Sequence, residues 1–71
     1  MFNNKMKATL IRNTINITAH PATFKKWWSE VQRNWTTCSA AKYLNPPRRA
    51  FGVYIIDGEP DAVRHIFSTS C

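Results

Sequence analysis

The chain has 71 residues, which is enough for one hydrophobic core and excludes a second domain. Hydrophobic residues make up 44% of the chain and aromatic residues 13%, and this composition excludes a chain that stays disordered. Ten Lys and Arg against four Asp and Glu give a formal net charge of +6, which favours an acidic protein or a nucleic acid as partner.

The charge is unevenly distributed along the chain. Residues 1–50 hold nine Lys and Arg against a single acidic residue, Glu30. Residues 51–71 hold only Arg64 against three acidic residues. A basic surface of this kind steers acidic partners by long-range attraction. The alternative is that the net charge only keeps a small protein in solution.

The first predicted element covers residues 6–19, which are rich in β-branched side chains. One alternating face holds Ile11, Ile15, Ile17 and Ala19. The opposite parity is apolar earlier in the segment, at Met6, Ala8 and Leu10. The alternation therefore changes phase near residues 10–11, which predicts either one bulged strand or a hairpin with its turn at residues 12–14.

A helix is predicted from Pro21 to about Trp35, with Pro21 in the first turn. Its apolar residues recur at helical spacing and form one stripe, namely Phe24, Trp27, Trp28, Val31 and Trp35. Three Trp residues are more than a core of this size easily encloses, so Trp28 and Trp35 are candidates for an exposed interface. The alternative is that all three fill the core.

Residues 36–50 show no clear period and are predicted to form a loop or an irregular hairpin connection. The sequence Asn45-Pro46-Pro47 excludes a helix there, although residues 41–44 have the composition of a short strand. Residues 51–56 are strand formers and end at Asp57-Gly58, which predicts a central strand. A second helix is predicted from Pro60, with an inner stripe formed by Val63, Ile66 and Phe67.

These elements predict a single α+β domain over residues 1–71, in the order β-α-(β)-β-α. We expect a sheet of two or three strands with two helices packed on one face, an arrangement that resembles an incomplete ferredoxin-like unit. A sheet this narrow leaves an edge exposed, so we expect a homodimer that hides it. No apolar run has the length of a signal peptide or a membrane span, and Cys38 and Cys71 are expected to be free thiols, which predicts a cytoplasmic protein without a membrane partner.

Three sets of residues are candidate sites of chemistry. Carboxylates at Asp57, Glu59 and Asp61 follow a strand and have the oxygen ligands that Mg²⁺ prefers, but a polar turn before a helix explains them equally. A zinc site would need His20, Cys38, His65 and Cys71, whose spacing matches no structural zinc motif. The set Cys38, His65 and Asp61 is the one nucleophilic combination available. We therefore predict no metal, no cofactor and no enzymatic activity.

The predicted binding residues are mostly basic or aromatic. Arg48 and Arg49 follow two prolines, which gives two guanidinium groups a stiff support suited to phosphate or carboxylate. Lys42 and Tyr43 extend this segment into a basic and aromatic contact of the kind that binds nucleic acids. The other candidates lie on the first helix, and they are Lys25, Lys26, Trp28 and Trp35.

Three functions remain open on these observations. The first is a small basic binding protein, of the accessory or phage-type regulator or inhibitor class, that occupies a surface on a macromolecular partner. The second is a protein whose function is direct nucleic-acid binding. The third is a small dimeric ferredoxin-like enzyme with a pocket lined by Tyr54, His65 and the Trp-rich helix.

Overall fold

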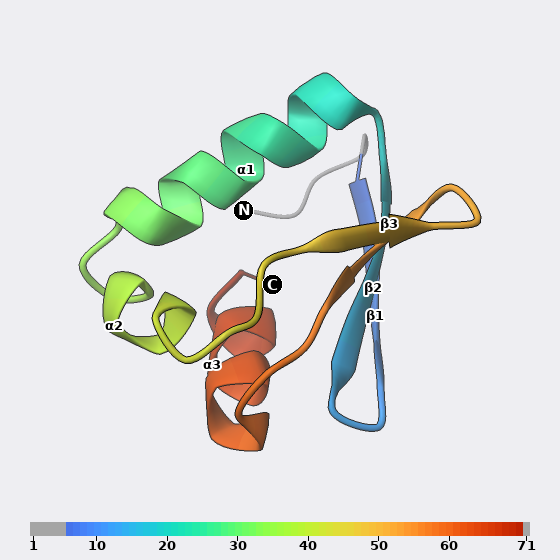
Figure 1. Cartoon of the computed structure of the whole chain (residues 1–71). Coiled ribbons are helices and arrows are strands. Elements are labelled where there is room, and N and C mark those ends of the chain that lie inside the picture. The colour runs from blue at the N-terminus through green and yellow to red at the C-terminus, as the bar shows by residue number, and fades with distance from the viewer. Residues whose placement is uncertain (1–5, 71) are drawn as a thin grey trace.

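The computed structural model describes residues 6–70, without the side chain of Ser70. Four strands and three helices follow one another along the chain (Figure 1). Their bounds are β1 Met6–Ile11, β2 Thr14–Ala19, α1 Pro21–Arg33, α2 Cys38–Ala41, β3 Arg48–Ala50, β4 Val53–Ile56 and α3 Pro60–Ser70. The predicted α+β class is therefore confirmed.

The four strands form one antiparallel sheet in the order β1-β2-β4-β3. All three helices lie on one side of this sheet, and none of the described residues forms a helix on its other side (Figure 1). The sequence predicted two or three strands and two helices, and neither the ferredoxin-like arrangement nor the dimer is confirmed. The additional strand is β3, whose three residues are too few to show an alternating pattern.

The first two strands form a hairpin, which decides between the two alternatives for residues 6–19. Its two-residue turn is Arg12-Asn13, with Arg12 at a φ of 57°. Met6, Ala8 and Leu10 pair with residues on the buried side of β2, so the phase change is the hairpin turn itself. Ile11 was wrongly predicted to face inward: it pairs with Thr14 on the opposite side of the sheet and is 55% exposed.

Helix α1 begins at Pro21, as predicted, and His20 caps it by accepting a hydrogen bond from the Ala22 N–H. Its buried residues are Phe24, Trp27 and Val31, while Trp28 is half-buried against the core. The helix ends at Arg33, two residues earlier than predicted. Trp35 therefore leaves the apolar stripe and is 84% exposed, because the Asn34 side chain accepts hydrogen bonds from Thr36 and turns the chain.

The segment predicted as a loop contains two further elements, helix α2 and strand β3. Residues 41–44 do not form a strand, since only Leu44 makes a bridge, to Gly58. Gly58 has a φ of 149°, and a Cβ there would come within 2.6 Å of the Tyr43 carbonyl oxygen. A glycine is thus required where these two segments meet.

Strand β4 begins at Val53 and not at Phe51 as predicted. Phe51 and Gly52 form the turn between β3 and β4, with φ values of 53° and 77°. The central position of the strand is confirmed, because β4 lies between β2 and β3.

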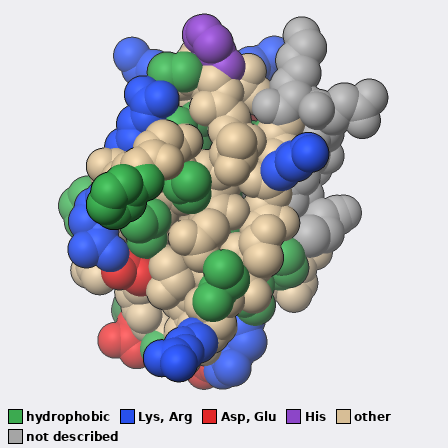
Figure 2. Space-filling model, turned by 90° about the vertical axis from the view of Figure 1, so that its right-hand side faces the viewer, with side chains coloured by type: hydrophobic (Ala, Val, Ile, Leu, Met, Phe, Trp, Pro, Cys, Tyr) green, Lys and Arg blue, Asp and Glu red, His purple; other side chains and the backbone are tan. Residues whose placement is uncertain are grey.

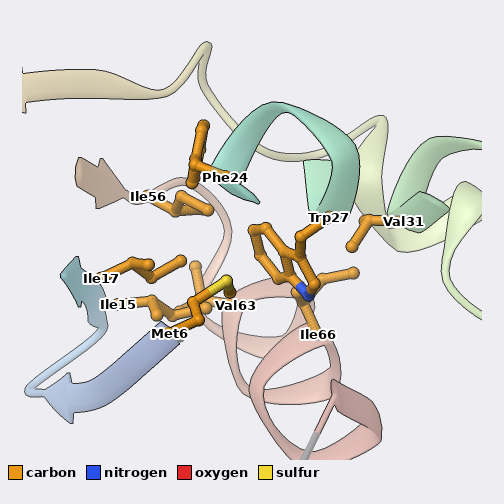
Figure 3. Packing of buried hydrophobic residues seen from close by; sticks show 9 residues of the cluster. All are labelled: Met6, Ile15, Ile17, Phe24, Trp27, Val31, Ile56, Val63 and Ile66. Carbon is orange, nitrogen blue, oxygen red and sulfur yellow. The ribbon is translucent and has the colours of Figure 1, made fainter. Parts of the chain in front are cut away.

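One core joins the sheet to α1 and α3. The buried hydrophobic residues point toward one another from both layers, as Figure 3 shows for Met6, Ile15, Ile17, Phe24, Trp27, Val31, Ile56, Val63 and Ile66. Helix α3 and its inner residues are as predicted, with Phe67 half-buried beside them. Across residues 6–70, no helix has the length and apolar character that crossing a bilayer requires.

Candidate binding surface

The β3–β4 hairpin, residues 48–56, has a phenylalanine, Phe51, in the turn at its tip. Positive φ values at both residues of a two-residue loop define a tight turn in which Asn, Asp and Gly are the favoured residues. Phe51 occupies the first of these positions, and its side chain is fully exposed, at 104%. The sequence therefore places a large aromatic ring in water at a position that disfavours it.

Arg48 lies on the side of the sheet that no helix covers, because it pairs with Ile55. Its Nη2 atom makes an ion pair of 2.7 Å with Oδ2 of Asp57, just beyond β4. The other carboxylate oxygen of Asp57 accepts a hydrogen bond of 3.0 Å from the Asn45 side chain. Part of the charge of Arg48 is thus already compensated within the protein.

Arg49 lies on the opposite side of β3, toward the helices. Its guanidinium carbon is 5.2 Å from the centroid of the Tyr54 ring, within the range of a cation–π contact. Tyr54 in turn stacks on Phe24 of α1, with centroids 3.9 Å apart and planes 2° from parallel. The two arginines, predicted to present their charges together, are separated because consecutive residues of a strand point to opposite faces.

The other predicted binding residues are spread over the molecule. Lys25 and Lys26 are exposed on α1, and Lys25 directly follows the Phe24 ring that stacks on Tyr54. Lys42 and Tyr43 are exposed just after α2. Trp28 packs partly against the core, whereas Trp35 is exposed between α1 and α2. A chain of contacts joins Arg49 through Tyr54 to Phe24 of α1. Ring contacts continue from Phe24 through Trp27 to the predicted residue Trp28.

The uncovered side of the sheet is mainly uncharged. Figure 2 faces this side and shows Lys and Arg side chains around its rim, with acidic groups confined to the lower left. The residues on it are Lys7, Thr9, Ile11, Thr14, Asn16, Thr18, Arg48, Ala50, Val53 and Ile55. Alternation along the strands predicts such a polar face, but the sequence alone did not show that the helices leave this face uncovered.

A groove of about 560 Å³ lies between α2 and α3. Its lining residues are Ser39, Ala40, Tyr43, Glu59, Asp61, Ala62 and His65. His65 makes a hydrogen bond of 2.8 Å between Nε2 and the Thr36 carbonyl oxygen. Tyr54, predicted to share a pocket with His65, instead stacks on Phe24 under α1.

The candidate chemical sets are not assembled in the part of the chain that the structure describes. Within residues 6–70, no three His, Cys, Asp or Glu side chains gather as metal ligands. Asp57 is engaged by Arg48, and Asp61 makes an ion pair of 3.1 Å with Arg64. Cys38 contacts the Trp35 carbonyl oxygen, and Cys71 lies outside the described residues.

Sequence reasoning missed Phe51 as a candidate site residue. The run from Phe51 to Ile56 has the composition of a continuous strand, and this hid the turn inside it. The available signal was Gly52, because a glycine inside a strand pattern indicates a bulge or a turn. Comparison of the chain with protein-family models, with curated proteins and with solved structures found no match.

Proposed function

We propose that this protein is a non-enzymatic binding module that occupies an acidic surface of a partner protein, with the β3–β4 hairpin as its main contact. Such occupation would make it a regulator or an inhibitor of that partner. The observation that carries the proposal is the fully exposed Phe51 at positive φ, beside two arginines.

Phe51 is unfavourable for the isolated protein in two ways. A non-glycine residue held in a sparsely populated backbone region costs on the order of 1–3 kcal/mol. Its ring also gains nothing from burial, since it is 104% exposed. Aromatic residues are, however, enriched among the anchors that dominate binding energy at protein interfaces. An aromatic residue presented at the tip of a hairpin is therefore suited to enter a pocket on a partner.

The basic residues near Phe51 favour a partner surface of negative charge. Arg49 makes a cation–π contact but no ion pair within residues 6–70, and Lys25 and Lys26 are exposed on the neighbouring helix. The remaining charge of the hairpin is that of Arg48, which Asp57 offsets. Charges of this kind raise the rate of association with an acidic surface and fix its orientation.

Direct nucleic-acid binding remains the second candidate, favoured by the net charge of +6. Its weakness lies in the distribution of the basic residues. Arg48 and Arg49 point to opposite sides of β3, and Lys42 follows α2, away from the hairpin. Within the described residues, the strands present no aromatic side chain on the uncovered side of the sheet, where bases would stack.

Two other expectations remain predictions. A homodimer would hide one of the two sheet edges, at β1 or at β3. A cytoplasmic location is the second. Neither is needed for the hairpin to bind a partner protein.

The proposed function is tested by capture with three immobilised proteins: the unaltered chain, the variant Phe51→Asn and the control Ile11→Thr. Asn suits the turn, so Phe51→Asn removes the ring and keeps the hairpin. Ile11→Thr removes an exposed hydrophobic side chain at the opposite hairpin, where Ile11 is 55% exposed.

From nuclease-treated lysate, we expect one specific protein to be captured by the unaltered chain and by Ile11→Thr but not by Phe51→Asn. Arg49→Glu should weaken the same capture, and raised salt should do so too. Capture that is equal for Phe51→Asn would overturn the role of the hairpin. Capture that nuclease abolishes would favour the nucleic-acid alternative.

A further inference from the structure

Strand β3 is an edge strand, because it pairs with β4 on one side and with no described strand on the other. Residues on it and just before it are exposed or half-buried, so this outer edge of β3 is accessible. An accessible edge offers unpaired backbone N–H and C=O groups to another strand. The outer edge of β3 also lies directly beside Phe51, at the centre of the proposed contact.

The register of the hairpin identifies which backbone groups are free. The pair that flanks a two-residue loop is hydrogen bonded, and hydrogen-bonded pairs alternate with pairs that are not. Ala50 and Val53 flank the loop, so Arg49 and Tyr54 form a pair without mutual backbone bonds. The N–H and C=O of Arg49 therefore both point to the outer edge.

The chemistry around this edge selects the side chains of an incoming strand. A residue placed opposite Arg49 would share its face, with Cα atoms about 5.5 Å apart. That face carries the guanidinium held over Tyr54, and beyond it the ring of Phe24. A carboxylate would be attracted at this position. The neighbouring residues of the incoming strand would lie on the other face, beside Ala50 and beside Arg48, whose charge Asp57 offsets.

The same charges argue against a second copy of this chain as the occupant. Pairing two β3 edges would bring the Arg49 side chains of both copies onto one face, and like charges on adjacent strands are destabilising. Pro47, two residues before Arg49, has no N–H to donate and limits the length of the pairing. The edge thus fits a short segment, centred on Arg49.

We propose that the outer edge of β3 binds an extended acidic segment of the partner protein by strand addition, with Arg49 supplying both backbone hydrogen bonds and the charge that selects a carboxylate. This proposal rests on the proposed function and names the structural class of its contact. Alternating acidic and apolar residues in the partner segment match the two faces of the added strand.

The test uses the full chain and two synthetic peptides of the same charge. The first is acetyl-Asp-Val-Asp-Val-Asp-amide, and the second has N-methyl groups on its backbone nitrogens, which removes the donors of a β-ladder. Binding is followed by nuclear magnetic resonance, through the shift and the hydrogen exchange of each backbone amide. We expect the first peptide to slow hydrogen exchange of the Arg49 amide. The affinity of the second peptide should be lower by a factor of about ten or more.

A variant pair separates the backbone donor from the charge. Arg49→Ala removes the side chain beyond Cβ and keeps the backbone N–H. Arg49→Pro also removes the N–H, which the register assigns to the outer edge and not to the ladder with β4. Peptide binding should fall for Arg49→Ala and fall further for Arg49→Pro. The amide spectrum of each variant reports whether the hairpin is intact.

Several results would overturn the strand addition. Equal binding of both peptides would show attraction by charge alone. Binding that shifts amides elsewhere and leaves Arg49 unchanged would place the contact on another surface, and pairing of β3 with a second copy would appear as a dimer in sedimentation. Failure of both peptides to bind, while capture of a partner still depends on Phe51, would reject the strand addition and leave the proposed function standing.

Discussion

The rings of Phe24 and Tyr54 stack face to face, 3.9 Å apart, and join the first turns of α1 to the centre of the sheet. Arg49 lies over Tyr54 and belongs to the same cluster. This cluster links the position of the edge strand to the main helix. The hairpin that carries Phe51 is therefore anchored at its base by aromatic packing, while its tip is free.

Replacing one ring tests this anchor. Phe24→Leu keeps an apolar side chain but removes the stacking, and we expect it to lower the free energy of unfolding by about 1–2 kcal/mol. Tyr54→Phe keeps both rings and should change it by less than about 0.5 kcal/mol. Urea denaturation measures both. An equal loss for Tyr54→Phe would show that the hydroxyl, and not the stack, stabilises the cluster.

A second prediction concerns Thr37, which is fully buried at the end of the α1–α2 connection. Its hydroxyl donates a hydrogen bond of 2.6 Å to the Val31 carbonyl oxygen, near the end of α1. Thr37→Val fills the same space but leaves this carbonyl without its partner, which should destabilise the fold by about 1–3 kcal/mol.

Thr37→Ser keeps the hydroxyl and loses one methyl group, so it should cost less, about 1 kcal/mol. Thr18→Val, at an exposed threonine of β2, is the control and should stay within about 0.5 kcal/mol. Thermal unfolding of the three variants ranks them. If Thr37→Ser were the most harmful, packing of the methyl group would outweigh the hydrogen bond.

The helices were predictable because their signals are long and redundant. Pro21 and the spacing of Phe24, Trp27 and Val31 predicted α1, and Pro60 with Val63 and Ile66 predicted α3 in the same way. Thirteen and eleven residues give several turns of periodic burial, so one wrong position, such as Trp35, does not change the assignment.

The strands and the candidate site were harder to predict, because they depend on pairing. Three residues of β3 carry no period, and its existence follows only from the partner strand β4. The exposure of Phe51 depends on a turn that its own residue type disfavours. Sequence reasoning placed Arg48 and Arg49 in a loop before a strand, whereas both residues belong to strand β3. It therefore could not predict that their side chains point to opposite faces of the sheet.

The two glycines give a prediction in which strain and steric clash are separated. At Gly52 the φ is 77° and nothing lies within 4 Å of an added Cβ, so Gly52→Ala should cost only the backbone strain, about 1–2 kcal/mol. At Gly58 the Cβ would also meet the Tyr43 carbonyl oxygen and Leu44 Cα, at 2.6 and 2.7 Å. Gly58→Ala should therefore be clearly the more destabilising of the two in urea denaturation. The reverse order would mean that the segment after α2 moves aside without loss.

The last prediction is that one substitution, at Phe51, raises stability and abolishes binding. Phe51→Asn replaces a ring that is fully exposed at a φ of 53° with a residue that tolerates this backbone region. We expect the free energy of unfolding to rise by about 0.5–1 kcal/mol while capture of the partner is lost. Ile11→Thr, the control at the other hairpin, should do neither, because Ile11 lies in regular strand geometry.

Chemical denaturation gives the first quantity for Phe51→Asn, and partner capture under identical conditions gives the second. A variant that is both less stable and fully able to bind would contradict the assignment of Phe51 as an anchor, since the ring would then serve the fold. We expect Phe51→Asn to be more stable and to bind no longer. That result would show that the fold does not require Phe51 and that binding is the property for which the residue is retained.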